Sequence, residues 1–79
     1  MHGEDVSWIL FTWELRERAR GRRWFYSQLE HLLSELPLKS WRKLGGSVYL
    51  VREENSGAFD ELLRRFEGPD LIWHKLRVK

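Results

Sequence analysis

The sequence predicts a small α+β domain with the element order strand, helix, strand, strand, helix, strand. Three observations lead to this class. Runs rich in β-branched and aromatic residues open and close the chain, at 6–15 and 71–78. Apolar residues recur at helical spacing between about 20 and 36, and again over 57–67. The pair Gly45-Gly46 separates two short strand-like runs between those helices.

The first strand is expected at residues 6–15. Seven of these ten residues are apolar, and neither Gly nor Pro interrupts them. Both alternating faces are apolar, which is typical of a strand in the middle of a covered sheet. A buried helix is the alternative interpretation, but the run is short for a helix and rich in aromatic side chains.

The first helix is expected from about Arg20 or Arg22 to Leu36. Its apolar stripe is formed by Phe25, Leu29, Leu32 and Leu36, and Leu33 widens it. Pro37 ends the helix, because proline lacks an amide donor and disfavours helical geometry in the residue before it.

Two short strands are expected next, at about 39–44 and 47–53. The Gly45-Gly46 pair can adopt the positive φ angles of a tight hairpin turn. A single strand with a glycine bulge is the alternative that this pattern leaves open.

The second helix is expected at about 57–67, and Gly68-Pro69 stops it. Asn55 or Ser56 can cap its first amides. Its apolar stripe consists of Phe59, Leu62, Leu63 and Phe66.

The last strand is expected at Leu71–Val78. One of its faces carries Ile72, His74, Leu76 and Val78. The other face carries Trp73, Lys75, Arg77 and Lys79 and is expected to be a solvated basic surface. We expect His74 to be half-buried because it alternates with apolar residues.

This element order predicts a ferredoxin-like βαββαβ fold. In that fold an antiparallel four-stranded sheet has both helices on one face. The other face is left open and is expected to hold part of the surplus of Trp and Tyr. An open face of this kind can take a second subunit, a ligand or nucleic-acid bases.

The composition limits the class of protein further. The 79 residues are expected to form one domain, 1–79, without cysteine and with a net charge of only +2. We expect no signal peptide and no membrane partner, since no stretch approaches the roughly 20 apolar residues of a membrane span. A cytoplasmic location fits these features. The basic charge is concentrated in two segments, 16–23 and 37–52, each with a net charge of +4.

The first basic segment is a candidate for contact with nucleic-acid phosphates. Its arginines are Arg16, Arg18, Arg20, Arg22 and Arg23. They lie near an expected helix start, and guanidinium groups match phosphate oxygens two at a time. The alternative is a solvated loop whose arginines pair in part with Glu14 and Glu17.

The second segment interleaves basic residues with an aromatic one. Its candidate residues are Lys39, Trp41, Arg42 and Lys43. Such a combination can hold backbone phosphates and stack a base. The alternative is that Trp41 packs in the core or at a dimer contact.

The segment around these residues is Trp41-Arg42-Lys43-Leu44-Gly45-Gly46-Ser47-Val48-Tyr49. It resembles the segment that contains the Ser-Val-Phe or Ser-Val-Tyr strand in the proteins of a known superfamily. That superfamily holds the small CRISPR-associated adaptation nuclease Cas-two and the VapD-like toxins. The order of an apolar first strand, an arginine-bearing loop and a Phe-x-x-Leu-Leu helix is also similar. The resemblance implies a ferredoxin-like fold and a homodimer formed through the sheets. It also implies either metal-dependent cleavage of nucleic acid or non-catalytic bridging of nucleic acid for a partner protein.

The nuclease members of the superfamily carry an Asp at the end of the first strand, and this chain departs from that pattern. The matching positions are Phe11-Thr12-Trp13-Glu14. Glu14 is therefore the candidate for both the catalytic and the metal-binding residue, with Mg²⁺ as the metal, since Mg²⁺ takes oxygen ligands.

We expect a homodimeric protein that binds DNA or RNA and has weak catalytic activity or none. One alternative is a metal-dependent endonuclease or endoribonuclease that uses Glu14. Another is a protein interaction module without nucleic-acid binding. The resemblance leaves open whether the chain is an enzyme.

Overall fold

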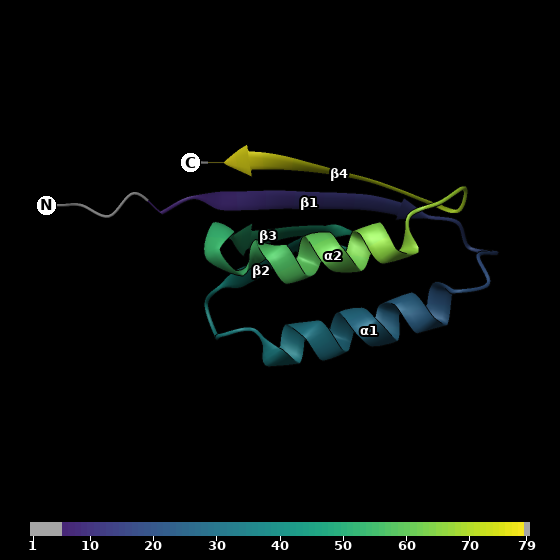
Figure 1. The fold of residues 1–79 in the computed structure, drawn as a ribbon, viewed down its shortest axis with the longest axis horizontal. Coiled ribbons are helices and arrows are strands. Elements are labelled where there is room, and N and C mark those ends of the chain that lie inside the picture. Colours follow the sequence, from purple (N-terminus) through teal and green to yellow (C-terminus); the bar gives the residue numbers. More distant parts are fainter. Residues whose placement is uncertain (1–5, 79) are drawn as a thin grey trace, which may run out of the picture.

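The computed structural model describes residues 6–78, and its elements follow the predicted order (Figure 1). They are β1 (Trp8–Leu15), α1 (Arg22–Glu35), β2 (Trp41–Gly45), β3 (Val48–Arg52), η1 (Glu53–Asn55), α2 (Ser56–Phe66) and β4 (Leu71–Val78). The short 3-10 turn η1 was not predicted. Neither helix in this part of the chain is long and apolar enough to cross a membrane.

The four strands form one antiparallel sheet in the order β2-β3-β1-β4, so the protein is of the α+β class. The prediction of a central first strand is confirmed, because β1 pairs with β3 on one side and β4 on the other. β2 and β1 are both antiparallel to β3 and therefore run in the same direction. The strand β3 is thus inserted between two strands that α1 connects.

The core lies between the sheet and both helices. The sheet contributes Phe11, Trp13, Tyr49, Val51 and Leu71, and the helices contribute Phe25, Leu29, Phe59, Leu62 and Leu63. Cross-strand partners point to the same side of a sheet, so these strand residues share one face. Both helices cover that face, and Figure 1 shows them on the same side of β1. The other face is open.

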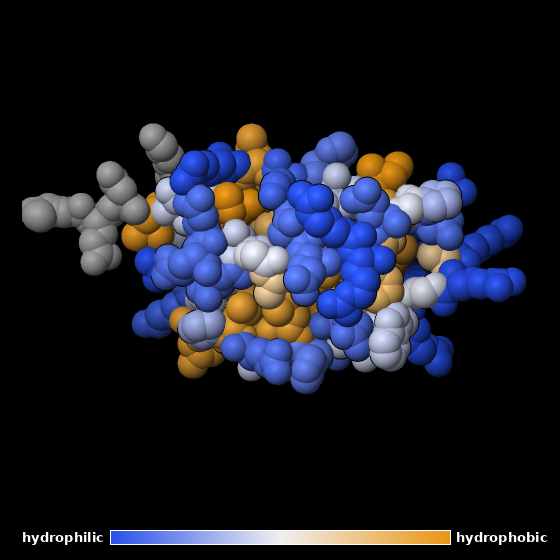
Figure 2. Space-filling model, viewed as in Figure 1, coloured by the Kyte–Doolittle hydropathy of each residue, from blue (hydrophilic) through white to orange (hydrophobic). Residues whose placement is uncertain are grey.

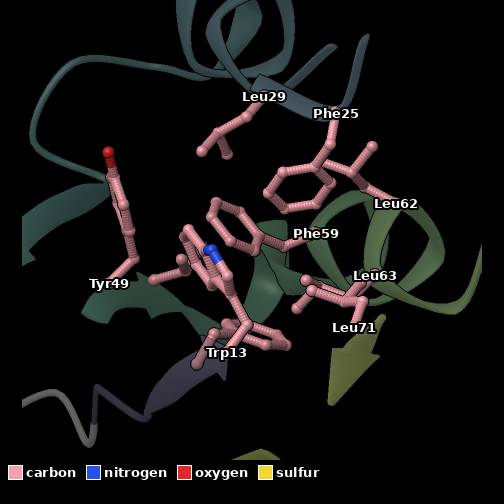
Figure 3. Packing of buried hydrophobic residues seen from close by; sticks show 10 residues of the cluster. Trp13, Phe25, Leu29, Tyr49, Phe59, Leu62, Leu63 and Leu71 are labelled. Atoms are coloured by element: carbon pink, nitrogen blue, oxygen red, sulfur yellow. The ribbon is translucent and has the colours of Figure 1, made fainter. Parts of the chain in front are cut away.

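Phe59 of α2 occupies the centre of this core. Its ring centroid lies 4.9 Å from that of Phe11 and 5.7 Å from that of Tyr49. Figure 3 shows it between Trp13 and Phe25. Close ring packing of this kind buries much apolar area in a small chain.

Two polar groups of the core come from aromatic residues. The Trp13 indole Nε1 donates a hydrogen bond to the Tyr26 hydroxyl, 3.4 Å away. Tyr26 lies outside the stripe that begins at Phe25, yet it packs against the core. Burial raises the pKa of Tyr49, and the neighbouring Tyr26 and Glu30 raise it further.

The prediction for β4 is wrong about which face lies on the helix side, although Lys75 and Arg77 are exposed as expected. The register pairs Trp13 with Trp73, so the basic face of β4 lies on the helix side. Its charges are paired there: Lys75 lies 2.7 Å from Asp60, and Arg77 lies 2.7 Å from Glu53. The expected position of Lys79 on this face lies outside the described residues.

The apolar face of β4 is the open one. Ile72 is 56% exposed, Leu76 is 64% exposed, and His74 is exposed rather than half-buried. The physical reason is that β4 is an edge strand, where acidic side chains of α2 and η1 neutralise the basic face. The alternation of apolar and polar residues along β4 cannot reveal these acidic partners, because they lie in other elements.

Most of the Trp and Tyr surplus lies on the helix side, so the open face holds a smaller part of it than the sequence suggested. Trp41 and Trp73 pack against the core from this side, where Trp13 and Tyr49 are buried. Among residues 6–78, Trp8 is the aromatic residue that the strand register places on the open face.

The hairpin between β2 and β3 forms, but its turn is Gly46–Ser47 rather than Gly45-Gly46. The strands also shift register between Lys43 and Gly45, so the hairpin contains the irregularity that the bulge alternative proposed. No described glycine has a positive φ. The positive φ, 69°, belongs to Lys39.

Neither predicted capping side chain caps α2. Asn55 precedes the helix without a side-chain hydrogen bond to its amides. The Ser56 hydroxyl instead donates to the Glu53 carbonyl oxygen, 2.8 Å away. The side chain of Ser56 therefore stabilises η1.

Candidate functional site

The arginine loop, residues 16–23, follows β1 directly and leads into α1. Backbone hydrogen bonds hold its start: the Arg16 amide donates to the Asp70 carbonyl oxygen at 3.0 Å, and the Ala19 amide to the Arg16 carbonyl oxygen at 3.1 Å. The Arg22 amide donates to the Ala19 carbonyl oxygen at 3.2 Å. The loop is therefore an ordered turn at one end of the sheet.

Arg22 stabilises this loop. Its Nη1 donates to the Leu15 carbonyl oxygen at 2.9 Å and lies 3.4 Å from the Arg16 carbonyl oxygen. Its guanidinium also lies over the Tyr26 ring, 5.4 Å from the centroid. Of the five predicted phosphate-binding arginines, Arg22 is the one whose guanidinium donates hydrogen bonds to the backbone of the described residues.

The other four arginines of the loop are exposed. They are Arg16, Arg18, Arg20 and Arg23. Within residues 6–78 none of them lies within 4.0 Å of a carboxylate, so Glu14 and Glu17 do not pair with them. Figure 2 shows hydrophilic side chains projecting from the end of the molecule where this loop lies.

The basic residues of α2 and β4 are arranged differently. Arg64 and Lys75 both pair with Asp60, at 2.6 and 2.7 Å. Arg65 pairs with Glu61, and Arg77 pairs with Glu53. The basic residues that form no ion pair in the described chain are thus concentrated in the two basic segments, 16–23 and 37–52.

Trp24 lies beside the exposed arginines and was missed in the sequence analysis. It is in the first turn of α1, directly after Arg23, and is 60% exposed. The signal was available, because the stripe that begins at Phe25 leaves position 24 outside the core. A cationic surface with an exposed aromatic ring can hold phosphates and stack a base.

The second basic segment does not form one surface. Trp41 is partly buried with its ring centroid 5.9 Å from that of Tyr49, which supports the core-packing alternative. Arg42 and Lys43 alternate, so Arg42 points to the open face and Lys43 to the helix side. Lys39 lies in the turn before β2.

The two basic segments lie at opposite ends of the sheet. The Ser40 carbonyl oxygen accepts from the Arg52 amide at 2.8 Å, and Arg52 pairs with Trp8 at the start of β1. The arginine loop follows the end of the same strand. Eight extended residues span roughly 23 Å, so Lys39 and the arginine loop do not converge on one phosphate group.

Glu14 is exposed on the open face near the end of β1. It lines a shallow depression of about 280 Å³ together with Arg16 and Asp70. In the described part of the chain no three His, Asp or Glu side chains gather to hold a metal ion. One chain therefore supplies Glu14 and Asp70 at most, which is a poor fit for Mg²⁺.

The open face of the sheet is mostly apolar. The strand register places on it Trp8, Leu10, Val48, Leu50, Ile72, Leu76 and Val78. Its charged groups are divided between the two ends. Arg42 and Arg52 lie at the end where β1 begins, and Glu14 lies at the end where β1 finishes.

Comparisons of the chain with protein-family models, with curated proteins and with solved structures found no match. The resemblance to the Cas-two and VapD-like superfamily therefore stays a prediction from the sequence.

Proposed function

We propose that the chain is a homodimeric nucleic-acid-binding protein of the ferredoxin-like fold, as its resemblance to the Cas-two and VapD-like superfamily implies. The element order βαββαβ supports this fold. The strand order also supports it, since from the β4 edge it reads β4-β1-β3-β2 and inserts one strand into a βαβ unit.

The observation that carries the nucleic-acid proposal is the unpaired charge of the arginine loop beside an exposed tryptophan. Arg16, Arg18, Arg20 and Arg23 are exposed, and the exposed Trp24 follows Arg23 directly in the first turn of α1. Each guanidinium that neutralises a phosphate releases bound counterions, which supplies affinity without sequence preference. A stacking ring favours unpaired bases over a closed duplex.

The dimer forms through the open face of the sheet. Strands about 4.8 Å apart and up to about 23 Å long present a face of a few hundred Å². Exposed Ile72 and Leu76 make this face apolar, and patches of such size mark interaction sites. A second copy is the proposed occupant because the charges at the two ends of the face have opposite signs and can complement each other.

One observation favours the alternative of a metal-dependent nuclease. Glu14 lies in the same depression as Asp70 and Arg16, beside the arginine loop. Cleavage that requires Mg²⁺ and is lost in Glu14→Gln, with binding retained, would establish this alternative. Two carboxylates in one chain make a weak magnesium site, so we propose nucleic-acid binding rather than cleavage as the function.

The test is binding of labelled single- and double-stranded DNA and RNA by fluorescence anisotropy at low salt. We expect binding, strongest for a single strand, and a loss of about tenfold or more in the double variant Arg18→Ala/Arg20→Ala. Arg65→Ala is the matched control, because this α2 arginine pairs with Glu61 and lies outside the loop. Absence of binding to all four probes would contradict the proposal and leave a protein interaction module.

A further inference from the structure

The open face of the sheet has basic side chains at one end and an acidic side chain at the other, and these charges are poorly paired within the described chain. Arg42 and Arg52 each place a guanidinium over the Trp8 ring, 5.9 and 5.8 Å from its centroid. Two like charges thus converge on one indole. A carboxylate or another anion at this end would relieve their repulsion.

Within residues 6–78, Arg42 has no anionic partner and Arg52 has only a long contact with Glu54. Arg42 forms no ion pair there. The nearest carboxylate oxygen of Glu54 lies 4.0 Å from the Arg52 Nε, too far for a hydrogen bond, and this buried Nε donates to no other group. The Arg52 side chain as a whole is 32% exposed, so a second anion can still approach it.

The opposite end of the face carries the matching charge. Glu14 is the acidic side chain that the described strands place on the open face, and no described cation pairs with it. Six residues separate Trp8 from Glu14 along β1, or about 20 Å. A single chain therefore cannot join the two ends, whereas a second copy can.

We propose that the homodimer packs open face on open face with the strands of one copy antiparallel to those of the other. Glu14 of each copy then lies against Arg52 and Arg42 of its partner, and the apolar residues meet between these two contacts. This inference rests on the proposed homodimer and assigns its orientation and its ion pairs. The two contacts are identical by symmetry.

The charge pattern selects this orientation over the other face-to-face arrangement. A two-fold axis perpendicular to the strands reverses their direction and brings the arginine end over the glutamate end. An axis parallel to the strands would instead place Arg42 and Arg52 of both copies together. Like charges brought together at an interface repel each other, so that arrangement is disfavoured.

The orientation has a consequence for metal binding. The two Glu14 carboxylates lie at opposite ends of the interface, about 20 Å apart. They cannot share a magnesium ion, so the dimer does not supply the paired carboxylates that a nuclease site would need.

Charge reversal tests the orientation. We expect Glu14→Arg and Arg52→Glu each to raise the dimer dissociation constant about tenfold or more, measured by sedimentation equilibrium. The double variant Glu14→Arg/Arg52→Glu restores opposite charges at both contacts and should return close to the wild-type value. Arg65→Glu on α2 is the control and should leave dimerisation unchanged.

Each outcome decides the inference. A wild-type dimer that is indifferent to both single reversals, or a double variant no better than the singles, overturns the orientation and leaves the homodimer standing. A monomeric wild type overturns the homodimer as well. Arg42→Glu replaces Arg52→Glu in the same scheme if circular dichroism shows that the Arg52 variant does not fold.

Discussion

Asp60 links the edge strand β4 to the helix α2. It accepts from Lys75 Nζ of β4 at 2.7 Å and from Arg64 Nε of α2 at 2.6 Å. The hydrogen bond from Lys75 is the largest cause that holds the pKa of Asp60 below its ordinary value, with Arg64 adding to it. The link between strand and helix is therefore stronger when the carboxylate is ionised.

Acid should weaken this link. A lowered pKa means that the stabilisation is present above the unfolded-state pKa of about 4 and is lost as the pH falls through the lower, folded-state value. We expect Asp60→Asn to lower the urea midpoint at pH 7 and to lose less stability than wild type between pH 5 and pH 2. Glu61→Gln is the control, since its partner Arg65 is 3.9 Å away and both are largely exposed. An unchanged pH dependence in Asp60→Asn would contradict this account.

Replacement of Phe59 tests how much the aromatic core contributes to stability. Phe59→Ala removes a fully buried ring from the centre of the aromatic cluster and should cost about 3–5 kcal/mol of unfolding free energy. That is a large part of the 5–15 kcal/mol typical of a small domain. Trp24→Ala, at an exposed position, should stay within about 0.5 kcal/mol of wild type. Urea unfolding measures both, and a similar cost for the two variants would contradict the placement of Trp24.

At the scale of elements, the arginine loop combines a structural residue with exposed candidates for binding. Arg22 donates to the end of β1 and packs on Tyr26 of α1, so it joins the two elements that flank the loop. The sequence pattern could predict the cluster of five arginines. It could not predict which of them donates to a backbone carbonyl oxygen, because that contact depends on the folded path of the chain.

Arg22→Ala should therefore act on stability and Arg18→Ala on affinity. Loss of a hydrogen bond from a charged donor costs about 1.5 kcal/mol or more, which urea unfolding would detect in Arg22→Ala. Arg18→Ala should keep wild-type stability and bind single-stranded nucleic acid more weakly. The opposite assignment, with Arg18 needed for folding and Arg22 dispensable, would show that the loop is organised differently.

The sequence also predicted the elements and the central position of β1, because long apolar runs and proline or glycine stops are local signals. It could not predict which face of β4 lies on the helix side. Ile72 and Leu76 read as a core face, but the acids that neutralise Lys75 and Arg77 come from α2 and η1, far away in the sequence. For Trp41 the sequence left stacking on a base and packing in the core as alternatives, because its neighbour Tyr49 becomes apparent only with the strand register.

For the whole molecule, the structure separates two surfaces. The strand register places the apolar sheet face opposite both helices. The arginine loop lies at one end of the sheet (Figure 1). A dimer through the sheet would leave the loops of both copies uncovered. In the antiparallel orientation the two loops lie at opposite ends of the dimer, so one nucleic acid could span both.

Leu76→Glu should abolish the dimer, because it places a charge on the apolar face where Leu76 is 64% exposed. Sedimentation equilibrium should then report the 9.6 kDa of one chain at concentrations where wild type is a dimer. Leu38→Glu is the matched control, since this leucine is 92% exposed and lies in the turn before β2. Dimerisation that survives Leu76→Glu would place the interface elsewhere.

The most direct test of the central claim is the salt dependence of nucleic-acid binding by the wild-type chain. If the four unpaired arginines of one loop contact a single strand, the logarithm of the association constant should fall linearly with the logarithm of salt concentration, with a slope of about −3. Removal of one of these arginines should reduce the slope by about 1. Affinity that is absent at low salt, or that does not change with salt, would contradict the claim that this loop binds nucleic acid.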